Sequence, residues 1–556
     1  MCTSIVEINN IAQLIVDQSR RQPRAPAIYF PQSRDGSGRV AYTHLTFAQL
    51  NERSDFLAWG LQAQGLRPGQ KALLMIRPSL DFYALFFALF KLGAVPVMID
   101  PGMGWSGFLK CVRQVQPEAF LGIPAAQLLR LLCRRSFRSV KTNITLGRRW
   151  FWGGCSVQEL PGENKPYPLF IPALDDPAAV LFTSGSTGPA KGVTYTQRIF
   201  LTQVQLVQRE YNIKPGEIDL ACFPLFSLFS VGLGAAVVIP DMDPTRPAFV
   251  NPERIIEPIR NLPVTYSFGS PTLWGRVAKY CAENDIALPG LKRVIMAGAP
   301  VPGQVHDWLL NQVLDHDAET YTPYGATEAL PVANFRGREM LSETRQATSA
   351  GKGMCVGKPI PEISAMTIKI SDAPITDFSQ VEPLPVGEIG ELCVKGDCVT
   401  REYYLRPDAT RMAKIPQGQE FWHRMGDVGY LDEQGRFWFC GRKNHCVQTR
   451  DPQGRPLTLF TIPCEAIFNS IPGVHRSALV GVGPKDDQTP VIIIEPEPGQ
   501  RLQPEEILSR SAQSPVTGLI RQVLFHPAFP VDVRHNAKIN REALSRWAGK
   551  RLGRSN

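Results

Sequence analysis

The 556-residue chain has twelve cysteines but no C-x-x-C pair. The spacings of zinc knuckles and of thioredoxin-type redox sites are therefore excluded, and we expect buried, reduced thiols. The sequence also lacks an internal repeat with a period of about 20–50 residues, which argues against a solenoid or a propeller. The remaining class is a globular protein with ordinary cores.

A membrane-spanning segment is missing as well. The longest apolar run, residues 82–99, is interrupted by Lys91 and contains Gly93 and Pro96. It therefore falls short of the ~20 apolar residues that a spanning helix needs. The first residues, MCTSIVEINN, carry an early acid and lack the basic start of a secretory signal. We expect a cytoplasmic location.

The chain has only a small excess of charge, with 60 Lys and Arg against 51 Asp and Glu, a net charge of +9. Such a balance gives no reason to expect a nucleic-acid partner. Acids are nevertheless absent from residues 119–158, which hold seven bases, and PAAQLLRLLCRRSFRSV (124–140) predicts an amphipathic basic helix. Two interpretations are open: a solvated edge of a docked helix, or an attachment surface (Arg130–Arg149) for an acidic partner enzyme or a membrane.

The order of apolar segments predicts a mixed α/β fold with largely parallel, doubly wound sheets. The length exceeds the ~250–300 residues at which one core stops growing, so at least two units are expected. The helical run FYALFFALFKLG (82–93) precedes the strand AVPVMID (94–100). Residues 387–441 alternate in short runs with turn signals, which is typical of antiparallel hairpins. We expect a body, residues 1–443, and a small C-terminal lid, residues 444–556. Further strands are expected at 71–77, 177–184, 264–270, 291–300, 475–483 and 490–498.

The segment LFTSGSTGPAKG (181–192) follows an apolar strand directly. Its backbone N–H groups and hydroxyls can bind phosphate oxygens, its glycines permit close approach, and Lys191 adds a positive charge. The order of residues is not that of a Walker A motif. A flexible Gly/Ser linker is the alternative, but the preceding strand and the closing lysine argue against it. The candidate phosphate-binding residues are Thr183, Ser184, Gly185, Ser186, Thr187, Gly188 and Lys191.

Two further motifs carry the side chains that a bound nucleotide requires. In YTPYGATE (321–328), Tyr324 can stack on a purine, Thr327 can bind a phosphate and Glu328 can hold Mg²⁺. In MGDVGYLDEQG (425–435) and FCGRK (439–443), Asp427 and Arg442 can bind ribose hydroxyls. Hairpin turn chemistry alone would also explain these Asp and Gly positions.

With these motifs in this order, the chain resembles the acyl-adenylate-forming superfamily, which includes acyl-CoA synthetases, peptide-synthetase adenylation domains and firefly luciferase. The resemblance extends from FALFKLGAVPVMIDP to NAKINR (536–541). It implies ATP and Mg²⁺ as cofactors, the two-unit fold, a hinge at Asn444 and a lysine, Lys538, that bridges carboxylate and phosphate during adenylation. The nucleotide-binding positions that it implies beyond the phosphate loop are Gly298, Ala299, Pro300, Tyr324, Gly325, Thr327, Glu328, Asp427 and Arg442.

Departures from the superfamily pattern indicate a branch. Ser227 of PLFS (224–227) stands where acyl-CoA synthetases usually have histidine, and Asp451 aligns with a glycine beside the CoA tunnel. Further stretches, such as IPDMDPTRPA (239–248) and HRMGD (423–427), resemble the β-lactone synthetases of bacterial long-chain olefin biosynthesis. This resemblance implies that a 2-alkyl-3-hydroxy fatty acid is adenylated and that its own hydroxyl then displaces AMP. Candidate pocket residues are Phe226, Ser227, Phe229, Gly269 and Ser270.

The base for ring closure is open at this point. His445, just past the hinge, can serve, and Ser227 can bind the hydroxyl instead. Two alternatives to lactone formation remain: an acyl-CoA or acyl-carrier ligase, and an inactive nucleotide-binding subunit. The presence of Lys191, Glu328, Asp427 and Lys538 argues against the inactive subunit.

Overall fold

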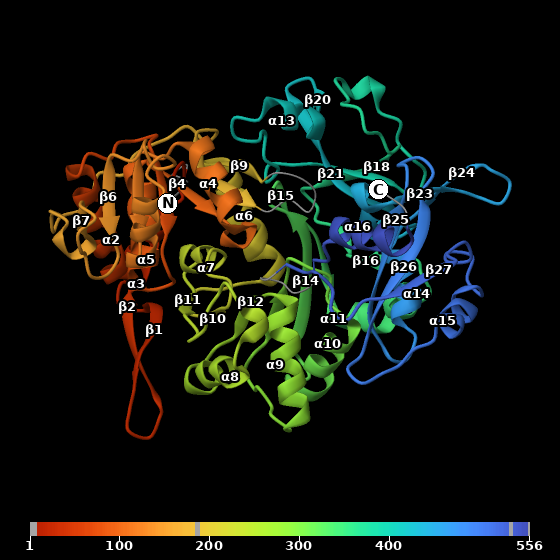
Figure 1. Ribbon diagram of the computed structural model, residues 1–556. Helices are drawn as coiled ribbons and strands as arrows, with labels where there is room; N and C mark the ends of the chain where they lie inside the picture. The colour runs from red at the N-terminus through yellow and green to blue at the C-terminus, as the bar shows by residue number, and fades with distance from the viewer. Residues whose placement is uncertain (1–7, 184–189, 533–537, 554–556) are drawn as a thin grey trace, which may run out of the picture.

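Three β-sheets form the first part of the protein, and two small sheets form the C-terminal part. The computed structural model describes residues 8–183, 190–532 and 538–553. In Figure 1 the N-terminal seven-stranded sheet lies at the left and the nine-stranded sheet at the lower centre. The antiparallel sheet lies above it, and the C-terminal part, in blue, at the right. The predicted mixed α/β fold is confirmed.

The seven-stranded sheet has the order β7-β6-β5-β3-β4-β8-β9 and is parallel except for β9. Its alternating side chains enter two cores. Leu73 faces the helices α4 and α5, whereas Leu74 faces α3. Helices therefore cover both faces, as in a doubly wound sheet. The strands are β3 (Lys71–Met75), β4 (Val95–Ile99), β5 (Ala119–Gly122), β6 (Thr142–Thr145), β7 (Cys155–Ser156), β8 (Pro177–Thr183) and β9 (Lys191–Thr196).

The apolar run with a single lysine forms helix α3 (Leu80–Leu92), which is buried almost all round. Ser79 caps its N-terminus, and Gly93 ends it with a φ of +75°, a conformation that glycine adopts without strain. The Lys91 ammonium is buried and donates to Asp55 of helix α2 at 2.5 Å. Lys91, the lysine that interrupts the apolar run, thus holds helix α3 against helix α2.

The nine-stranded sheet has the order β17-β15-β14-β13-β12-β10-β11-β1-β2 and is parallel from β14 to β1. Helices α8 and α9 pack on one of its faces in a separate core. Its strands are β1 (Pro26–Arg34), β2 (Val40–Thr46), β10 (Ile218–Ala221), β11 (Ala236–Val238), β12 (Tyr266–Gly269), β13 (Arg293–Met296), β14 (Glu319–Ala326), β15 (Ala329–Arg336) and β17 (Lys358–Pro359).

The predicted hairpins form a six-stranded antiparallel sheet, and from Val447 onward the chain builds two sheets with cores of their own. The first contains β16 (Met354–Cys355), β18 (Ser364–Ile368), β19 (Gly390–Lys395), β20 (Lys414–Gln417), β21 (Glu420–Leu431) and β22 (Phe437–Arg442). The others contain β23 (Val447–Arg450) with β24 (Pro456–Leu459), and β25 (Val474–Val482) with β26 (Thr489–Pro496) and β27 (Gln522–Phe525).

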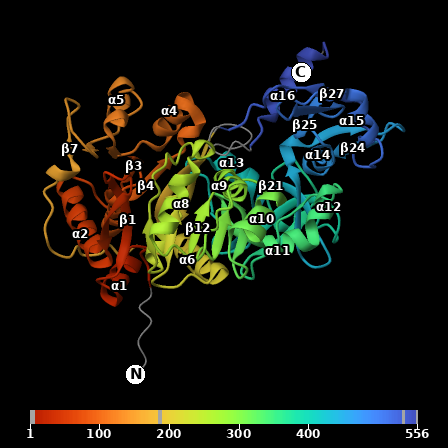
Figure 2. The same ribbon diagram turned by 90° about the horizontal axis from the view of Figure 1, so that it is seen from below.

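The helices surround these sheets, and Figure 2 shows α4, α5 and the C-terminal helices projecting on the same side of the molecule. None of the helices in the described part of the chain has the length and apolarity to cross a bilayer. They are α1 (Gln13–Arg21), α2 (Phe47–Ala63), α3, α4 (Gly104–Val115), α5 (Pro124–Leu132), α6 (Gln197–Tyr211), α7 (Ser227–Gly232), α8 (Pro252–Asn261), α9 (Pro271–Glu283), α10 (Gly303–Trp308), α11 (Gly337–Glu339), α12 (Arg345–Ser349), α13 (Pro407–Ala413), α14 (Thr461–Asn469), α15 (Pro504–Ser511) and α16 (Arg541–Arg551).

The basic helix predicted over 124–140 is too long. Helix α5 ends at Leu132, and turns follow. The cause is Phe137, which enters the core and packs on Phe120 with ring centroids 5.3 Å apart. The prediction about cysteines holds for residues 8–553 as far as they are described, since all eleven there are free and most are buried.

Candidate active site

The carboxyl ends of the parallel strands β12 and β13 bring two candidate segments to one sheet edge. The amide of Ala297 donates to the carbonyl of Gly269 at 3.2 Å, so Gly298–Pro300 follows β13 directly beside Gly269 and Ser270. Gly298 has a φ of +97°, which favours glycine there. Ser270 caps helix α9 by accepting from the amide of Leu273. Ligands bind at such strand ends in α/β sheets.

A first polar cluster joins Tyr324, Asp427 and Arg442. Asp427 and Arg442 lie opposite each other on β21 and β22 and form an ion pair of 2.7 Å. The Tyr324 hydroxyl donates to the other carboxylate oxygen at 2.5 Å. Burial and the adjacent Asp427 raise the pKa of Tyr324 well above its usual value, so its hydroxyl stays a donor. The structure thus brings together the predicted purine-stacking and ribose-binding residues.

Gly325 continues this cluster along β14. A Cβ there would lie 2.6 Å from the carbonyl oxygen of Ala329, so no side chain fits. Thr327 is held from another element, because the Tyr195 hydroxyl of β9 donates to the Thr327 carbonyl at 2.7 Å. The motif is therefore a tight connection between β14 and β15.

A second polar cluster joins Lys191, Tyr403 and Glu328. The Tyr403 hydroxyl donates to the Glu328 carboxylate at 2.7 Å, and the Lys191 ammonium lies 4.8 Å from the centre of the Tyr403 ring. Burial lowers the pKa of Lys191, and the charge of Glu328 opposes this shift. Glu328 follows Tyr324 by four residues at the β14–β15 connection, so the two clusters lie beside each other. The sequence motifs at 191, 324–328, 427 and 442 thus meet in one site.

Glu328 is the candidate Mg²⁺ ligand. The residues that the structure describes contain no group of three or more His, Cys, Asp or Glu side chains that could hold a metal. A single carboxylate nevertheless fits Mg²⁺, which is commonly held by one or two carboxylates together with substrate phosphates and water. The predicted phosphate-loop residues Ser184, Gly185, Ser186, Thr187 and Gly188 lie outside the described residues, and Thr183 ends β8 opposite Lys191.

The candidate acyl pocket is lined with aromatic rings. Phe226 stacks on Phe268 with ring centroids 4.1 Å apart, and Phe229 lies 5.7 Å from Phe226. Ser227 is buried, donates to the carbonyl of Pro224 at 2.6 Å and lies 2.6 Å from the Tyr83 hydroxyl. Its hydroxyl is therefore already engaged within the protein.

The residues predicted around the hinge lie between β22 and β23. Asn444 is exposed, and His445 is half-buried. Burial, together with the positive charges of Arg541 and Arg442, lowers the pKa of His445 to about 4, so the imidazole is neutral at pH 7. Lys538 is exposed in the C-terminal part, where its amide donates to Asp532 at 2.9 Å.

Sequence reasoning missed Tyr403, Tyr83 and Asp219. Tyr403 and Tyr83 stand in no motif, and only the fold brings them to Glu328 and Ser227. Asp219 is a single acid within the apolar strand β10, where Ser230 donates to it at 2.7 Å. Burial raises the pKa of Asp219 to about 7. It lies with Phe226 at a small internal cavity, and its place as a single acid in an apolar strand is the signal that could have found it.

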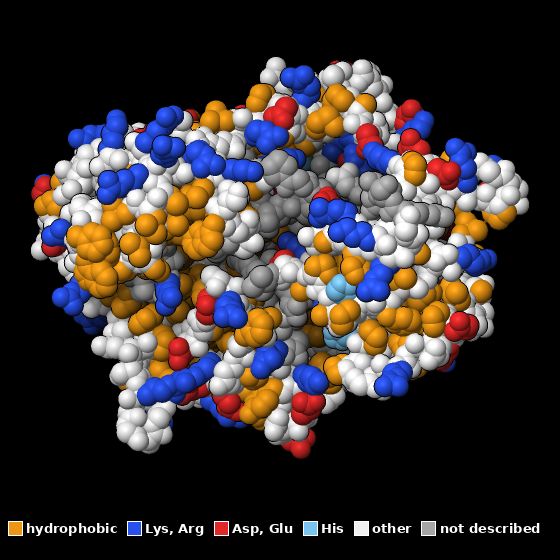
Figure 3. Space-filling view, in the orientation of Figure 1, with side chains coloured by type: hydrophobic (Ala, Val, Ile, Leu, Met, Phe, Trp, Pro, Cys, Tyr) orange, Lys and Arg blue, Asp and Glu red, His pale blue; other side chains and the backbone are white. Residues whose placement is uncertain are grey.

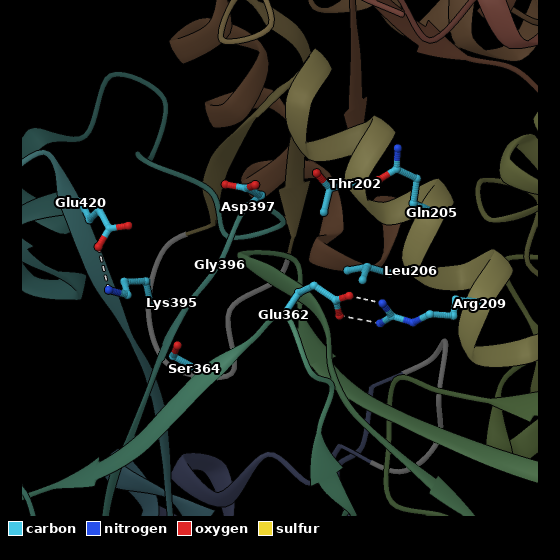
Figure 4. Close-up of a pocket in the computed structure, with 10 residues that line it drawn as sticks. All are labelled: Thr202, Gln205, Leu206, Arg209, Glu362, Ser364, Lys395, Gly396, Asp397 and Glu420. Carbon is cyan, nitrogen blue, oxygen red and sulfur yellow. Dashed lines mark hydrogen bonds and ion pairs between the residues drawn. The ribbon is translucent and has the colours of Figure 1, made fainter. Parts of the chain in front are cut away.

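A separate groove lies away from these clusters. It has a volume of about 600 Å³ and is lined by α6 and the antiparallel sheet, where Arg209 pairs with Glu362 (Figure 4). It contains none of the predicted site residues. The chemistry of the two polar clusters, rather than groove size, identifies the site.

The chain belongs to the AMP-binding enzymes, because the model of that family matches residues 15–404. It is therefore an ATP-dependent, adenylate-forming enzyme. It is 45% identical over 557 residues to an olefin beta-lactone synthetase of Stenotrophomonas maltophilia (strain K279a), with 98% of each chain covered. An olefin beta-lactone synthetase of Xanthomonas campestris pv. campestris is 44% identical over 554 residues, with 97% of this chain and 98% of the relative covered.

Solved structures share the fold. The amide bond synthetase McbA from Marinactinospora thermotolerans superposes with a TM-score of 0.77 at 20% identity, covering 97% of this chain and 99% of that one. ATP-bound MatB from Rhodopseudomonas palustris gives 0.76 at 18% identity, covering 98% and 99%. At these identities the likeness supports the architecture alone.

Proposed function

We propose that this enzyme is an ATP-dependent β-lactone synthetase. It adenylates a long-chain 2-alkyl-3-hydroxy fatty acid, whose 3-hydroxyl then attacks the activated carbonyl and releases AMP and the β-lactone. The observation that carries the adenylation step is the meeting of Lys191, Tyr403 and Glu328 beside the Tyr324–Asp427–Arg442 cluster. The second step is supported by the similarity to two olefin beta-lactone synthetases, which are 45% and 44% identical over nearly the whole chain.

In the first step the substrate carboxylate attacks the α-phosphorus of ATP, and pyrophosphate leaves. Asp427 and Arg442 hold the ribose, Tyr324 packs on the adenine between the Gly298–Pro300 backbone and β14, and Thr327 binds the α-phosphate. Lys191 and Lys538 stabilise the negative charge that develops on the phosphoryl oxygens. Glu328, held by Tyr403, is placed to bind Mg²⁺, which would neutralise the triphosphate.

In the second step the 3-hydroxyl oxygen forms a bond to the acyl carbon, the bond from that carbon to the AMP oxygen breaks, and the hydroxyl proton leaves to a base. Holding the hydroxyl against the carbonyl supplies a proximity effect of up to ~7–11 kcal/mol against ring strain. His445 is neutral at pH 7, so it can accept a hydrogen bond from the hydroxyl. Ser227 is a weaker candidate for this contact because its hydroxyl is already bonded to Pro224 and Tyr83.

Transfer to CoA is the competing second step. Asp451, which aligns with a glycine at the CoA tunnel of related ligases, lies in the turn between β23 and β24 and accepts from the amides of Gln453 and Arg455. Asp451 is therefore held by hydrogen bonds within its own β23–β24 hairpin. This arrangement supports an intramolecular acceptor over CoA.

One assay tests the proposal. The enzyme is given ATP, Mg²⁺ and a 2-alkyl-3-hydroxy fatty acid, with and without CoA, and the products are identified by mass spectrometry. We expect AMP, pyrophosphate and β-lactone in equal amounts whether CoA is present or not. A thioester product, or strict dependence on CoA, would refute lactone formation, and the absence of pyrophosphate with every acid would favour an inactive subunit.

Two further parts of the proposal concern motion and location. We place a hinge at Asn444, so that residues 444–556 move as a lid over the body, residues 1–443.

We also place the enzyme in the cytoplasm, where ATP is available and where free cysteines such as the eleven described here stay reduced. The basic segment Arg130–Arg149 is proposed as an attachment surface, and the side chains around it determine which partner it fits.

A further inference from the structure

Large apolar side chains are exposed on one face of the N-terminal part. Ten such side chains are exposed among the described residues, and four of them lie close in sequence at Leu128, Leu132, Trp150 and Phe151. Leu128 and Leu132 are one helical turn apart on α5, and Trp150 and Phe151, which are 56% and 75% exposed, stand in the loop before β7. Figure 3 shows apolar side chains gathered over α5 and this loop.

The loop that presents the two aromatic side chains is fixed to the protein. The Arg130 guanidinium of α5 donates to the carbonyl of Trp152 at 2.7 Å, and the buried Trp152 indole donates to Thr145 at 2.9 Å. Gly154 has a φ of +72°, and a Cβ there would lie 2.1 Å from the carbonyl oxygen of Asn143. The exposure of Trp150 and Phe151 is therefore built into the local structure.

Positive charge surrounds these apolar side chains. In residues 119–158 only Arg149 forms an ion pair among the described residues, with Glu159 at 3.0 Å. The other exposed bases are without an acidic partner in the described part of the chain, and Figure 3 shows blue side chains along the upper edge of the apolar face. We define the basic–aromatic patch as Leu128, Leu132, Arg134, Arg135, Arg138, Lys141, Arg148, Trp150 and Phe151.

We propose that the basic–aromatic patch binds the surface of an anionic lipid bilayer. Leucine, phenylalanine and tryptophan enter the boundary between headgroups and acyl chains, while arginine and lysine contact anionic headgroups. Helix α5 projects from the molecule on the same side as α4 (Figure 2). A projecting surface with charge of one sign complements an anionic membrane.

This binding is independent of the proposed reaction, because the patch contains none of the residues that we place at the nucleotide or acyl site. Membrane binding would nevertheless affect the supply of substrate for that reaction. Long-chain acids partition into bilayers, so an enzyme attached to the bilayer surface meets its substrate at a higher local concentration. The patch would then serve delivery of substrate, and catalysis itself would not need it.

Vesicle flotation tests the proposal with the full-length protein. Vesicles of phosphatidylcholine alone are compared with vesicles that contain roughly a third phosphatidylglycerol. We expect flotation only with the anionic vesicles and a decrease as salt is raised from about 50 to 500 mM. The variants Trp150→Ser/Phe151→Ser and Arg134→Glu/Arg135→Glu/Arg138→Glu should each lower bound protein at least about tenfold.

Matched variants elsewhere control for the loss of exposed apolar area and charge. Phe249→Ser/Leu405→Ser removes two exposed apolar side chains, and Arg20→Glu/Arg21→Glu/Arg24→Glu reverses three exposed bases, both away from the patch. These variants should float like the unchanged protein, and all variants should keep its thermal unfolding profile. Equal binding by patch and control variants, or no flotation of the unchanged protein, would overturn the proposal. Binding to polyglutamate but not to anionic vesicles would overturn it in favour of an acidic protein partner.

Discussion

The body and the C-terminal part contribute to the site in different ways. In the body, each functional carboxylate is held by side chains from other elements: Glu328 by Tyr403, and Asp427 by Tyr324 and Arg442. In the C-terminal part, Lys538 is exposed, and its amide donates to the Asp532 carboxylate. In the proposed mechanism the body therefore holds the nucleotide with groups that are already paired, whereas the C-terminal part would bring Lys538 to it by moving.

The strongest test of this difference is Lys538→Ala. We expect the adenylation rate to fall by about 10²–10³-fold, because a positive charge is removed from the transition state for attack on phosphorus. ATP binding should change little, since the preformed site lies in the body. ATP–pyrophosphate exchange measures the rate and calorimetry the binding. Lys550→Ala, at an exposed position of helix α16, is the control, and full exchange by Lys538→Ala would contradict the assigned role.

A second variant, Asp427→Asn, perturbs the Tyr324–Asp427–Arg442 cluster in the body. It removes the charge that pairs with Arg442 and weakens the acceptor of the Tyr324 hydroxyl. We expect the KM for ATP to rise about tenfold or more, because a hydrogen bond to a charged group contributes about 1.5–3 kcal/mol. Steady-state kinetics at several ATP concentrations measures the change. Asp35→Asn alters an exposed ion pair with Arg39 in the β1–β2 turn and should leave the KM unchanged.

A smaller effect is expected from Tyr403→Phe, which removes only the hydroxyl that holds Glu328. The Mg²⁺ concentration at half-maximal rate should rise about three- to tenfold, as one hydrogen bond to a carboxylate is lost. Tyr430→Phe removes a hydroxyl that donates to the Lys352 carbonyl and serves as the control. If Mg²⁺ dependence stayed the same, Glu328 would not be the group that Tyr403 positions for the metal.

The smallest effect concerns pH and His445. Because the pKa of His445 is lowered to about 4, the imidazole is neutral throughout the neutral range. Release of lactone from a preformed acyl-adenylate should therefore vary less than about twofold between pH 5.5 and 8.5. His445→Ala should slow this step and leave ATP–pyrophosphate exchange unchanged. A rise in rate centred near pH 6.5 would show that a group with an ordinary histidine pKa controls the step.

Sequence motifs predicted the fold class and the hairpins, and they named Lys191, Tyr324, Glu328, Asp427 and Arg442, which the structure brings together, because each motif rests on a local pattern. Glycines, hydroxyls and charges at fixed spacing identify a phosphate loop or a turn without reference to distant residues. Tyr403 could not be predicted, since its contact with Glu328 spans 75 positions and depends on how two sheets pack. The length of α5 was wrong for a similar reason: Phe137 is drawn into a core that the periodicity of the segment does not reveal.

The residue just before the proposed hinge is anchored to the body. The Lys443 ammonium donates to the carbonyl of Ser371 at 2.8 Å and lies 3.4 Å from Glu391, which also pairs with the buried Arg424. These contacts hold Lys443 to the body, so the proposed rotation of the lid would begin beyond Lys443. A short pivot at the proposed hinge would restrict the path of the lid, so Lys538 would approach the nucleotide along few trajectories, with little conformational entropy lost at each closure.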